Sequence, residues 1–124
     1  MDDFPEFMKN PVNRISTASQ FTEGVEGYVF DGADGSQVAF WSCSQDRVST
    51  VHAHDFDEYV IVIEGRCVLI MGESRIELVA GDEFLVPKGT RQSMEVSRGT
   101  RTVHVFGGKR ARRERELLST PLGP

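Results

Sequence analysis

The sequence predicts an all-β fold, an antiparallel sandwich or barrel, from three observations. Short runs rich in Val, Ile, Phe and Tyr recur at regular intervals between residues 25 and 108. Gly, Asp and Ser separate these runs in combinations that are typical of tight turns. No stretch inside this block shows the period of an amphipathic helix. Regularly spaced short strands joined by tight turns are typical of sandwiches and barrels.

Nine strands are expected in the central block, each ending at a turn signal. The strands are residues 27–31, 37–43, 48–54, 58–63, 66–71, 75–79, 83–86, 91–97 and 100–106. The turn signals between them are Gly32 to Gly35, Glu64-Gly65, Gly72-Glu73-Ser74, Gly81-Asp82 and Arg98-Gly99.

Two terminal segments complete the expected organisation. Residues 1–24 are mixed and polar and include Pro5 and Pro11, which predicts an N-terminal arm that is irregular or forms an edge strand. Residues 25–108 are expected to form a barrel, the single domain for which 124 residues leave room. Residues 109–124 contain five basic residues, all within 109–115, and end in Pro-Leu-Gly-Pro, which predicts a basic tail with one or two helical turns and a frayed end.

Composition and charge exclude several classes of protein. The chain is 39% apolar and 27% charged, like an ordinary soluble globular protein, and its longest apolar runs are too short for a membrane helix. The acidic start lacks the features of a signal peptide, so we expect a cytoplasmic protein whose Cys43 and Cys67 are thiols. A formal charge of −5 argues against nucleic-acid binding. The basic tail is interpreted as a solvated end that folds back on an acidic body.

The strands around Glu64-Gly65 have two apolar faces. If this pair is a two-residue hairpin turn, Val62 faces Cys67 and Val60 faces Leu69. Alternation then gives one face with Glu58, Val60, Val62, Cys67, Leu69 and Met71, and another with Tyr59, Ile61, Ile63, Val68 and Ile70. A barrel has only one interior, so the second face needs a cover, which a homodimer partner or the N-terminal arm could supply.

Two of the three histidines lie in Val51-His52-Ala53-His54. Residues two apart on a strand point to the same side, so the imidazoles of His52 and His54 are expected to converge. Glu58 follows a tight turn and begins the next strand. Two imidazoles and a carboxylate on adjoining strands can hold a divalent cation and leave positions open to water or substrate.

These residues resemble the cupin family. Its first motif, HxH-x3-E-x6-G, is matched in full by His52, His54, Glu58 and Gly65, although Asp46 stands where a glycine often precedes it. Its second motif, G-x5-P-x-G-x2-H, is matched by Gly81, Pro87 and Gly89, but Gln92 replaces the histidine. The resemblance covers roughly residues 37–106. It implies a jelly-roll barrel, the double-stranded β-helix, with a divalent metal inside: Zn, Fe, Ni or Mn.

The replacement of the motif histidine by Gln92 does not determine which residue completes the ligand set. Gln92 is expected to ligate through its amide oxygen or to hold a metal-bound water, unless the site has lost its metal. If Arg98 is the centre of a hairpin, residue 92 pairs with His104. His104 is then a fourth ligand, a residue that orients Gln92, or a hydrogen-bonded core histidine. Alternation places further side chains in the barrel, mainly as packing: Thr50, Val60, Val62, Cys67, Leu69, Met94, Thr102 and Phe106, with Phe40 or Trp41.

Two functions of different classes follow. The first is a metal-dependent enzyme that acts on a small organic molecule, of the isomerase, lyase or dioxygenase type. The second is a non-catalytic module that binds or senses a metal or small ligand. The intact His52, His54 and Glu58 favour the enzyme, while Gln92 favours the binding module. His104 is the best candidate for a general base if it does not bind the metal. The expected partners are a small molecule and a second copy of the chain.

Overall fold

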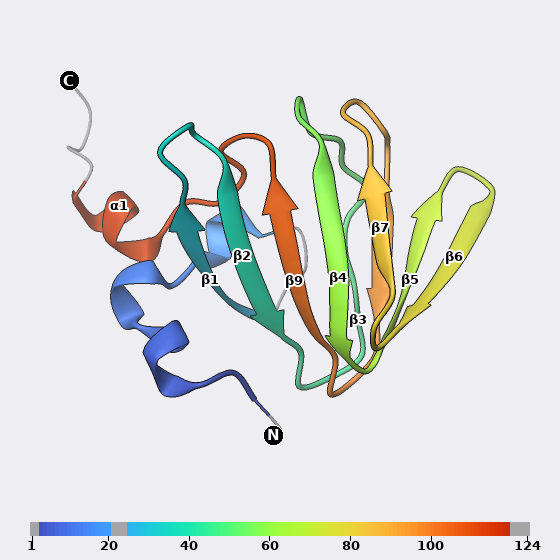
Figure 1. Ribbon diagram of the computed structural model, residues 1–124, viewed down its shortest axis with the longest axis horizontal. Coiled ribbons are helices and arrows are strands. Elements are labelled where there is room, and N and C mark those ends of the chain that lie inside the picture. The colour runs from blue at the N-terminus through green and yellow to red at the C-terminus, as the bar shows by residue number, and fades with distance from the viewer. Residues whose placement is uncertain (1–2, 21–24, 120–124) are drawn as a thin grey trace.

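The computed structural model describes residues 3–20 and 25–119, and its strands form two antiparallel sheets (Figure 1). The all-β jelly-roll prediction is confirmed. The strands are β1 Glu26–Asp31, β2 Gln37–Ser42, β3 Arg47–Val48, β4 Glu58–Glu64, β5 Arg66–Met71, β6 Ser74–Val79, β7 Glu83–Val86, β8 Ser93–Val96 and β9 Arg101–Phe106. One sheet has the order β1-β2-β9-β4-β7 and the other β3-β8-β5-β6. Among the described residues, no helix is both long and apolar enough to cross a membrane.

The main core lies between the two sheets and joins β4 and β7 to β5, β6 and β8. It consists of inward-facing side chains, each at most 9% exposed: Val60, Val62, Cys67, Leu69, Leu78, Val86 and Met94. Burying an aliphatic side chain of this kind stabilises the fold by roughly 1.5–3 kcal/mol. The cluster therefore holds the two sheets together.

The predicted hairpin between β4 and β5 is wrong. β4 pairs with β7 and β9, while β5 pairs with β6 and β8, so the chain changes sheets at Gly65. The inward faces are nevertheless as expected, because alternation along each strand does not depend on which strand is its partner. The outward set does not form one face. Tyr59, Ile61 and Ile63 lie on the five-stranded sheet, and Val68 and Ile70 lie on the other.

Gly65 is the residue that permits this change of sheet. Its φ is +87°, and a Cβ added there would lie 2.6 Å from the Cα of Thr100. Thr100 cannot move away easily, because it is 1% exposed. Its Oγ1 also accepts from the amide of Arg66 at 3.0 Å and donates to the carbonyl of Arg66 at 2.9 Å. The glycine of the first motif is thus a structural requirement of the fold.

Gly65→Ala is expected to lower the free energy of unfolding by roughly 2–4 kcal/mol, through left-handed strain and the clash with Thr100. Gly72→Ala is the matched control, since Gly72 has a φ of +60° but nothing within 4 Å of an added Cβ. It should cost only the conformational strain, about 1–2 kcal/mol. Urea unfolding measures both. Equal losses in the two variants would show that the Thr100 contact does not matter.

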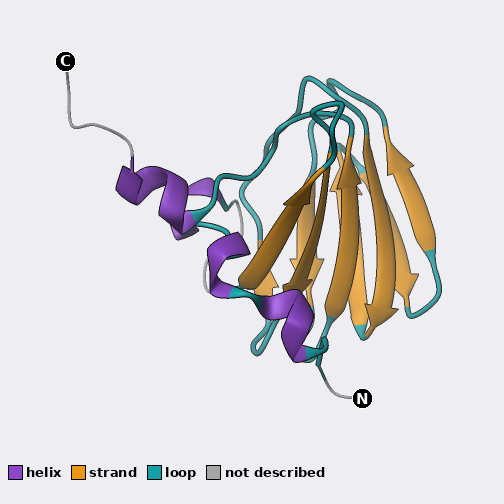
Figure 2. Ribbon diagram, turned by 60° about the vertical axis from the view of Figure 1, so that its left-hand side comes forward, coloured by secondary structure: helices purple, strands orange, loops and turns teal. Residues whose placement is uncertain are grey.

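The N-terminal arm combines both expected forms. It contains three short turns of 3-10 helix, Glu6–Lys9, Pro11–Asn13 and Thr17–Ser19. It also pairs like an edge strand, with the amide of Ile15 donating to the carbonyl of Gly27 at 2.9 Å. The arm runs beside β1 on the outside of the barrel (Figure 2).

The C-terminal segment folds back onto the arm, and Ala111 and Arg113 are buried there rather than solvated. The amide of Ser16 donates to the carbonyl of Arg112 at 2.8 Å, and Ile15 pairs with Arg113. One short helix, α1 (Glu114–Ser119), follows. Residues 120–124, for which a frayed end is expected, lie outside the described residues, as do residues 1–2 and 21–24 of the arm.

Candidate functional site

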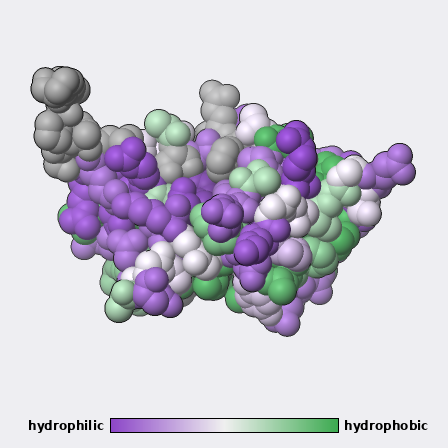
Figure 3. Space-filling model, turned by 90° about the horizontal axis from the view of Figure 1, so that it is seen from above, coloured by the Kyte–Doolittle hydropathy of each residue, from purple (hydrophilic) through white to green (hydrophobic). Residues whose placement is uncertain are grey.

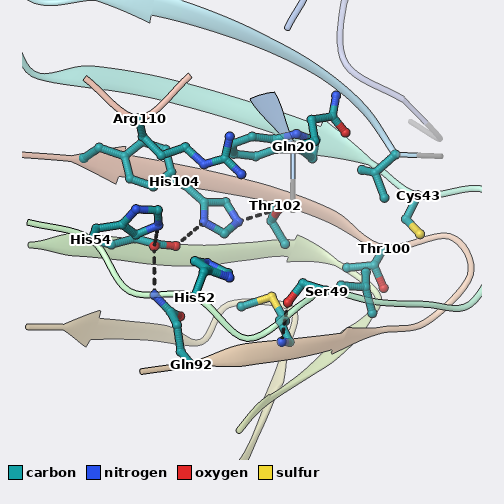
Figure 4. A pocket seen from close by; sticks show the side chains of 16 residues that line it. Gln20, Cys43, Ser49, His52, His54, Gln92, Thr100, Thr102, His104 and Arg110 are labelled. Carbon is teal, nitrogen blue, oxygen red and sulfur yellow. Dashed lines mark hydrogen bonds and ion pairs between the residues drawn. The ribbon is translucent and has the colours of Figure 1, made fainter. Parts of the chain in front are cut away.

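A pocket opens between the two sheets and adjoins the main core at Met94. Every residue that the sequence predicts for the site lines it: His52, His54, Glu58, Gln92 and His104 (Figure 4). The structure therefore brings together all five side chains. Their ability to hold a metal remains a prediction.

His52 and His54 reach the pocket from a bulged segment, whereas a continuous strand over residues 48–54 was predicted. Val48 pairs with Glu95 and His52 with Gln92, so the three residues between Val48 and His52 oppose only two residues of the other segment. The ladder breaks because the amide of Met94 donates to the hydroxyl of Ser49 at 2.8 Å. A bulge reverses the alternation and redirects side chains.

The bulge changes which neighbouring side chains face the pocket. Ser49 is buried and lines it, while Thr50, the residue expected there, is exposed. Past the bulge, the amides of His52 and Gln92 each donate to the other's carbonyl at 2.8 Å. The side chains of His52 and Gln92 therefore face the same way, although the hairpin pairing of Gln92 with His104 is wrong. Gln92 directly precedes β8 of one sheet, and His104 lies on β9 of the other.

The turn of the second motif is attached to the first motif. Gly89 has a φ of +80°, and its amide donates to the carbonyl of His54 at 2.8 Å. The amide of Lys88 donates to a carboxylate oxygen of Asp57 at 2.9 Å. These two bonds fix the turn that precedes Gln92 against the segment that holds the histidines.

Glu58 is the centre of the site. It is 4% exposed, and one carboxylate oxygen lies 2.7 Å from Nδ1 of His104. The other oxygen accepts from Nε2 of Gln92 at 3.2 Å and lies 3.4 Å from Nε2 of His54. Burial alone would raise the pKa of this carboxyl, but the hydrogen bonds from His104 and His54 outweigh burial and hold the pKa well below its ordinary value. Glu58 is therefore ionised at neutral pH.

His104 is positioned by contacts at both ring nitrogens. Nδ1 faces Glu58, and Nε2 lies 3.0 Å from the hydroxyl of Thr102. The indole ring of Trp41 packs edge-on against the imidazole, with a centroid distance of 4.9 Å. In this arrangement His104 acts as a hydrogen-bonding partner of the carboxylate.

His52 has the protonation that metal binding requires. Its Nδ1 lies 2.8 Å from the carbonyl oxygen of Thr50, which puts the proton on Nδ1 and the lone pair on Nε2. Burial lowers the pKa of His52, so the neutral ring is favoured. The ring of His54 lies 5.0 Å from that of His52 and stacks on Phe56 at 4.9 Å.

The donor set fits a divalent first-row metal by its chemistry. Neutral imidazole, carboxylate and amide oxygen are ligands that Zn, Fe, Ni and Mn accept. Within residues 3–20 and 25–119, no three His, Cys, Asp or Glu side chains are arranged to hold an ion as they stand. Glu58 instead contacts His104, Gln92 and His54, so a metal would have to enter among these contacts.

Sequence reasoning missed one charged residue of the pocket. Arg110 lines it from the C-terminal segment that was expected to be a solvated tail. No motif marks Arg110, because its position depends on how the segment packs on the barrel. Trp41, Met94, Thr102 and Phe106 line the pocket as predicted. The inert thiol expected of Cys67 is supported, since Cys67 is 1% exposed and burial raises its pKa to about 11.

Comparisons with known proteins agree with this architecture. A polyketide cyclase, RemF from Streptomyces resistomycificus, is 18% identical with a TM-score of 0.66, over 83% of this chain and 80% of its own. An RmlC-like cupin from Shewanella frigidimarina is 16% identical with a TM-score of 0.66, over 93% of both chains. KdgF from Halomonas sp. is 16% identical with a TM-score of 0.62, over 82% of this chain and 96% of its own.

At these identities the structural likeness shows the fold alone. No curated protein matches the chain. The family model described as "Cupin domain" matches residues 43–107, just over half of the sequence and the part that contains all five candidate site residues. The chain therefore belongs to the cupin family.

Proposed function

We propose that this protein is a metal-dependent enzyme that acts on a small organic molecule, of the isomerase, lyase or dioxygenase type. His52, His54 and Glu58 would hold the metal, which we expect to be Zn, Fe, Ni or Mn. The observation that supports this most is that His52, His54 and the ionised carboxylate of Glu58 line one pocket with largely apolar walls, with Nε2 of His54 3.4 Å from that carboxylate.

The other site residues have roles around that group. Gln92 can turn its amide so that the oxygen replaces the nitrogen beside Glu58, which makes it a fourth ligand or an anchor for water. His104 holds a proton at Nδ1 against Glu58 and is the best candidate to move a proton to or from a bound substrate. A divalent metal in this pocket would supply Lewis acidity toward a carbonyl or hydroxyl oxygen or, as iron, oxygen chemistry.

A non-catalytic binding or sensing module is the second candidate. The hydrogen bonds that Glu58 accepts from Gln92 and His104 favour it, because they hold the buried carboxylate without any ion. By contrast, RemF, a protein of similar fold, is a polyketide cyclase. This likeness supports the first candidate, the enzyme, because it shows that the same architecture can carry out catalysis.

Elemental analysis of the purified protein tests the proposal most directly. One equivalent of Zn, Fe, Ni or Mn for each chain is expected. Turnover of a small molecule or metal-dependent oxygen consumption then favours the enzyme, whereas a ligand that raises the melting temperature without being consumed favours the binding module. A preparation without metal that binds none of these ions on titration would contradict both metal-dependent forms.

We also propose that the protein is a homodimer joined through the five-stranded sheet. The arm covers one part of its outer face, where Phe4 packs on Tyr28 and Phe40. The neighbouring part stays apolar and open at β4 and β7, with Ile63 41% and Leu85 54% exposed. Figure 3 shows hydrophilic residues at the end with the C-terminal segment and hydrophobic patches along the lower edge of the view. A second copy with the same apolar patch is the complement that a two-fold interface requires.

Light scattering is expected to give twice the mass of one chain, and Ile61→Lys is expected to give a folded monomer. Ile61 lies at the middle of β4 on the open part of the face. Val48→Lys is the matched control, because Val48 is 65% exposed on the other sheet. A wild-type monomer at micromolar concentration would contradict the dimer, as would dissociation by the control alone.

A further inference from the structure

The N-terminal arm is fixed to the barrel just before it reaches the pocket. Ile15 is 1% exposed and packs with Val29 and Phe106 in a second apolar cluster. The 3-10 turn Thr17–Ser19 follows, and the amide of Gln20 donates to the carbonyl of Thr17 at 3.3 Å. The backbone that carries Gln20 is therefore held in place from both the barrel and the turn.

The side chain of Gln20 lines the pocket with an acceptor that lacks a partner. Figure 4 shows Gln20 on the side of the pocket opposite Gln92. Its Oε1 is buried and has no hydrogen-bond partner among the described residues. An unpaired buried acceptor is destabilising, so such atoms in proteins normally meet a donor. Because this acceptor belongs to a pocket wall, a bound molecule can supply the donor.

The remaining walls define what else such a molecule needs. Apart from the histidines and two charged residues, the described lining is neutral and largely apolar, including Val25, Met94 and Val96. The two charged residues are Glu58 and Arg110, which carry opposite charges. Burial lowers the pKa of Arg110 to about 10, and the charge of Glu58 opposes that shift, so Arg110 is a cation at neutral pH. In the metal-free pocket the pair therefore leaves no net charge for an ionic ligand to neutralise.

A hydroxyl group on an apolar body meets these conditions. In solution water can reach Oε1 of Gln20, and a ligand that expels this water must replace its hydrogen bond. A hydroxyl replaces it with one small neutral group, whereas a ketone of the same size has no hydrogen to donate. A primary amine would bring a positive charge into the pocket that contains Arg110.

We propose that the pocket binds a small neutral alcohol, whose hydroxyl donates to Oε1 of Gln20 while its carbon skeleton lies against the apolar walls. The inference rests on the proposed function in taking the pocket as the substrate site, and it adds the substrate class. Gln20 is then a specificity-determining residue that the N-terminal arm contributes to the barrel.

Cyclohexanol and cyclohexanone are suitable probes, because they share one ring and only the alcohol has a hydrogen to donate. The chain has a single tryptophan, Trp41, which lines the pocket, so its indole N–H resonance reports occupation in an NMR titration. Titrations at neutral pH use chelator-treated wild type, Gln20→Met and Gln45→Met. Methionine keeps the length of the side chain and removes the acceptor. Gln45→Met is the matched control, because it makes the same change at an exposed residue between β2 and β3.

Wild type should bind cyclohexanol about ten-fold more tightly than cyclohexanone, because only the alcohol replaces the hydrogen bond at Oε1. In Gln20→Met the two affinities should agree to within about two-fold, mainly through weaker binding of cyclohexanol. Gln45→Met should keep the wild-type preference. Cyclohexylamine and cyclohexanecarboxylate, which are both charged at neutral pH, should bind less tightly than cyclohexanol.

Equal affinity of wild type for the alcohol and the ketone would overturn the inference, and so would a Trp41 resonance that cyclohexanol does not shift. A preference that survives Gln20→Met would overturn the role of Gln20, and tighter binding of either charged analogue would overturn the neutral class. The wild-type comparison needs no variant, so it decides the question even if a substitution disturbs folding. A preference for the alcohol in chelator-treated protein supports the inference whether or not the protein binds a metal, which separates it from the metal proposal.

Discussion

Replacing either His52 or His54 by alanine is expected to abolish stoichiometric metal binding. The two rings lie 5.0 Å apart, and Nε2 of His54 is 3.4 Å from Glu58, so each supplies one of the three strongest donors of the proposed site. A site with one imidazole and one carboxylate offers too few ligands to retain a first-row metal against a chelator. Elemental analysis after dialysis against a weak chelator measures the loss.

Neither substitution should unfold the barrel. Both histidines lie outside the main core between the sheets, and a fold with that much buried apolar surface does not depend on one ion. Thr50→Ala serves as control, since Thr50 belongs to the same bulged segment but its side chain is exposed. Circular dichroism should give the same β spectrum for all variants. If both histidine variants keep the wild-type metal content, the site is wrongly assigned.

The strands of the barrel could be predicted from the sequence because each has a local signal. Apolar alternation located β4 and β5, and glycine-containing turns located their ends. Partners could not be predicted in the same way. The pair Glu64-Gly65 is compatible with a hairpin turn and with a change of sheet. The choice between them depends on the packing of Gly65 against Thr100, a residue distant in sequence.

The bulge before His52 had no signal that could be recognised in advance. It arises because the Ser49 hydroxyl takes the place of a backbone acceptor for Met94. The hydrogen bond between Ser49 and Met94 depends on the position of β8, which the sequence around His52 does not reveal. Four of the five predicted site residues meet because the two motifs specify their spacing from the turns, whereas His104 meets them because β9 pairs with β4 and brings His104 beside Val60, two residues from Glu58. Arg110 could not be predicted, since its place depends on Gln37, 73 residues away.

Gln92→His is expected to tighten metal binding by about ten-fold or more, because an imidazole is a better donor than a neutral amide oxygen to Zn, Ni, Cu or Fe. Residue 92 is well placed for a new metal ligand. Gln92 is 3% exposed, and its amide nitrogen already lies 3.2 Å from Glu58. The turn at Gly89 is bonded to His54, so a new side chain at residue 92 starts from the same backbone. Competition titration with a fluorescent chelator measures the affinities of variant and wild type.

His104→Ala is the companion variant, because His104 contacts the same carboxylate at 2.7 Å. If His104 only orients Glu58, affinity should fall by about 10–100-fold without complete loss, as for other residues that support a metal ligand. If His104 has taken over as the fourth ligand, the variant should lose the metal and Gln92→His should restore part of it. Equal affinities in wild type, Gln92→His and His104→Ala would exclude both roles and leave His52, His54 and Glu58 as a three-ligand site completed by water.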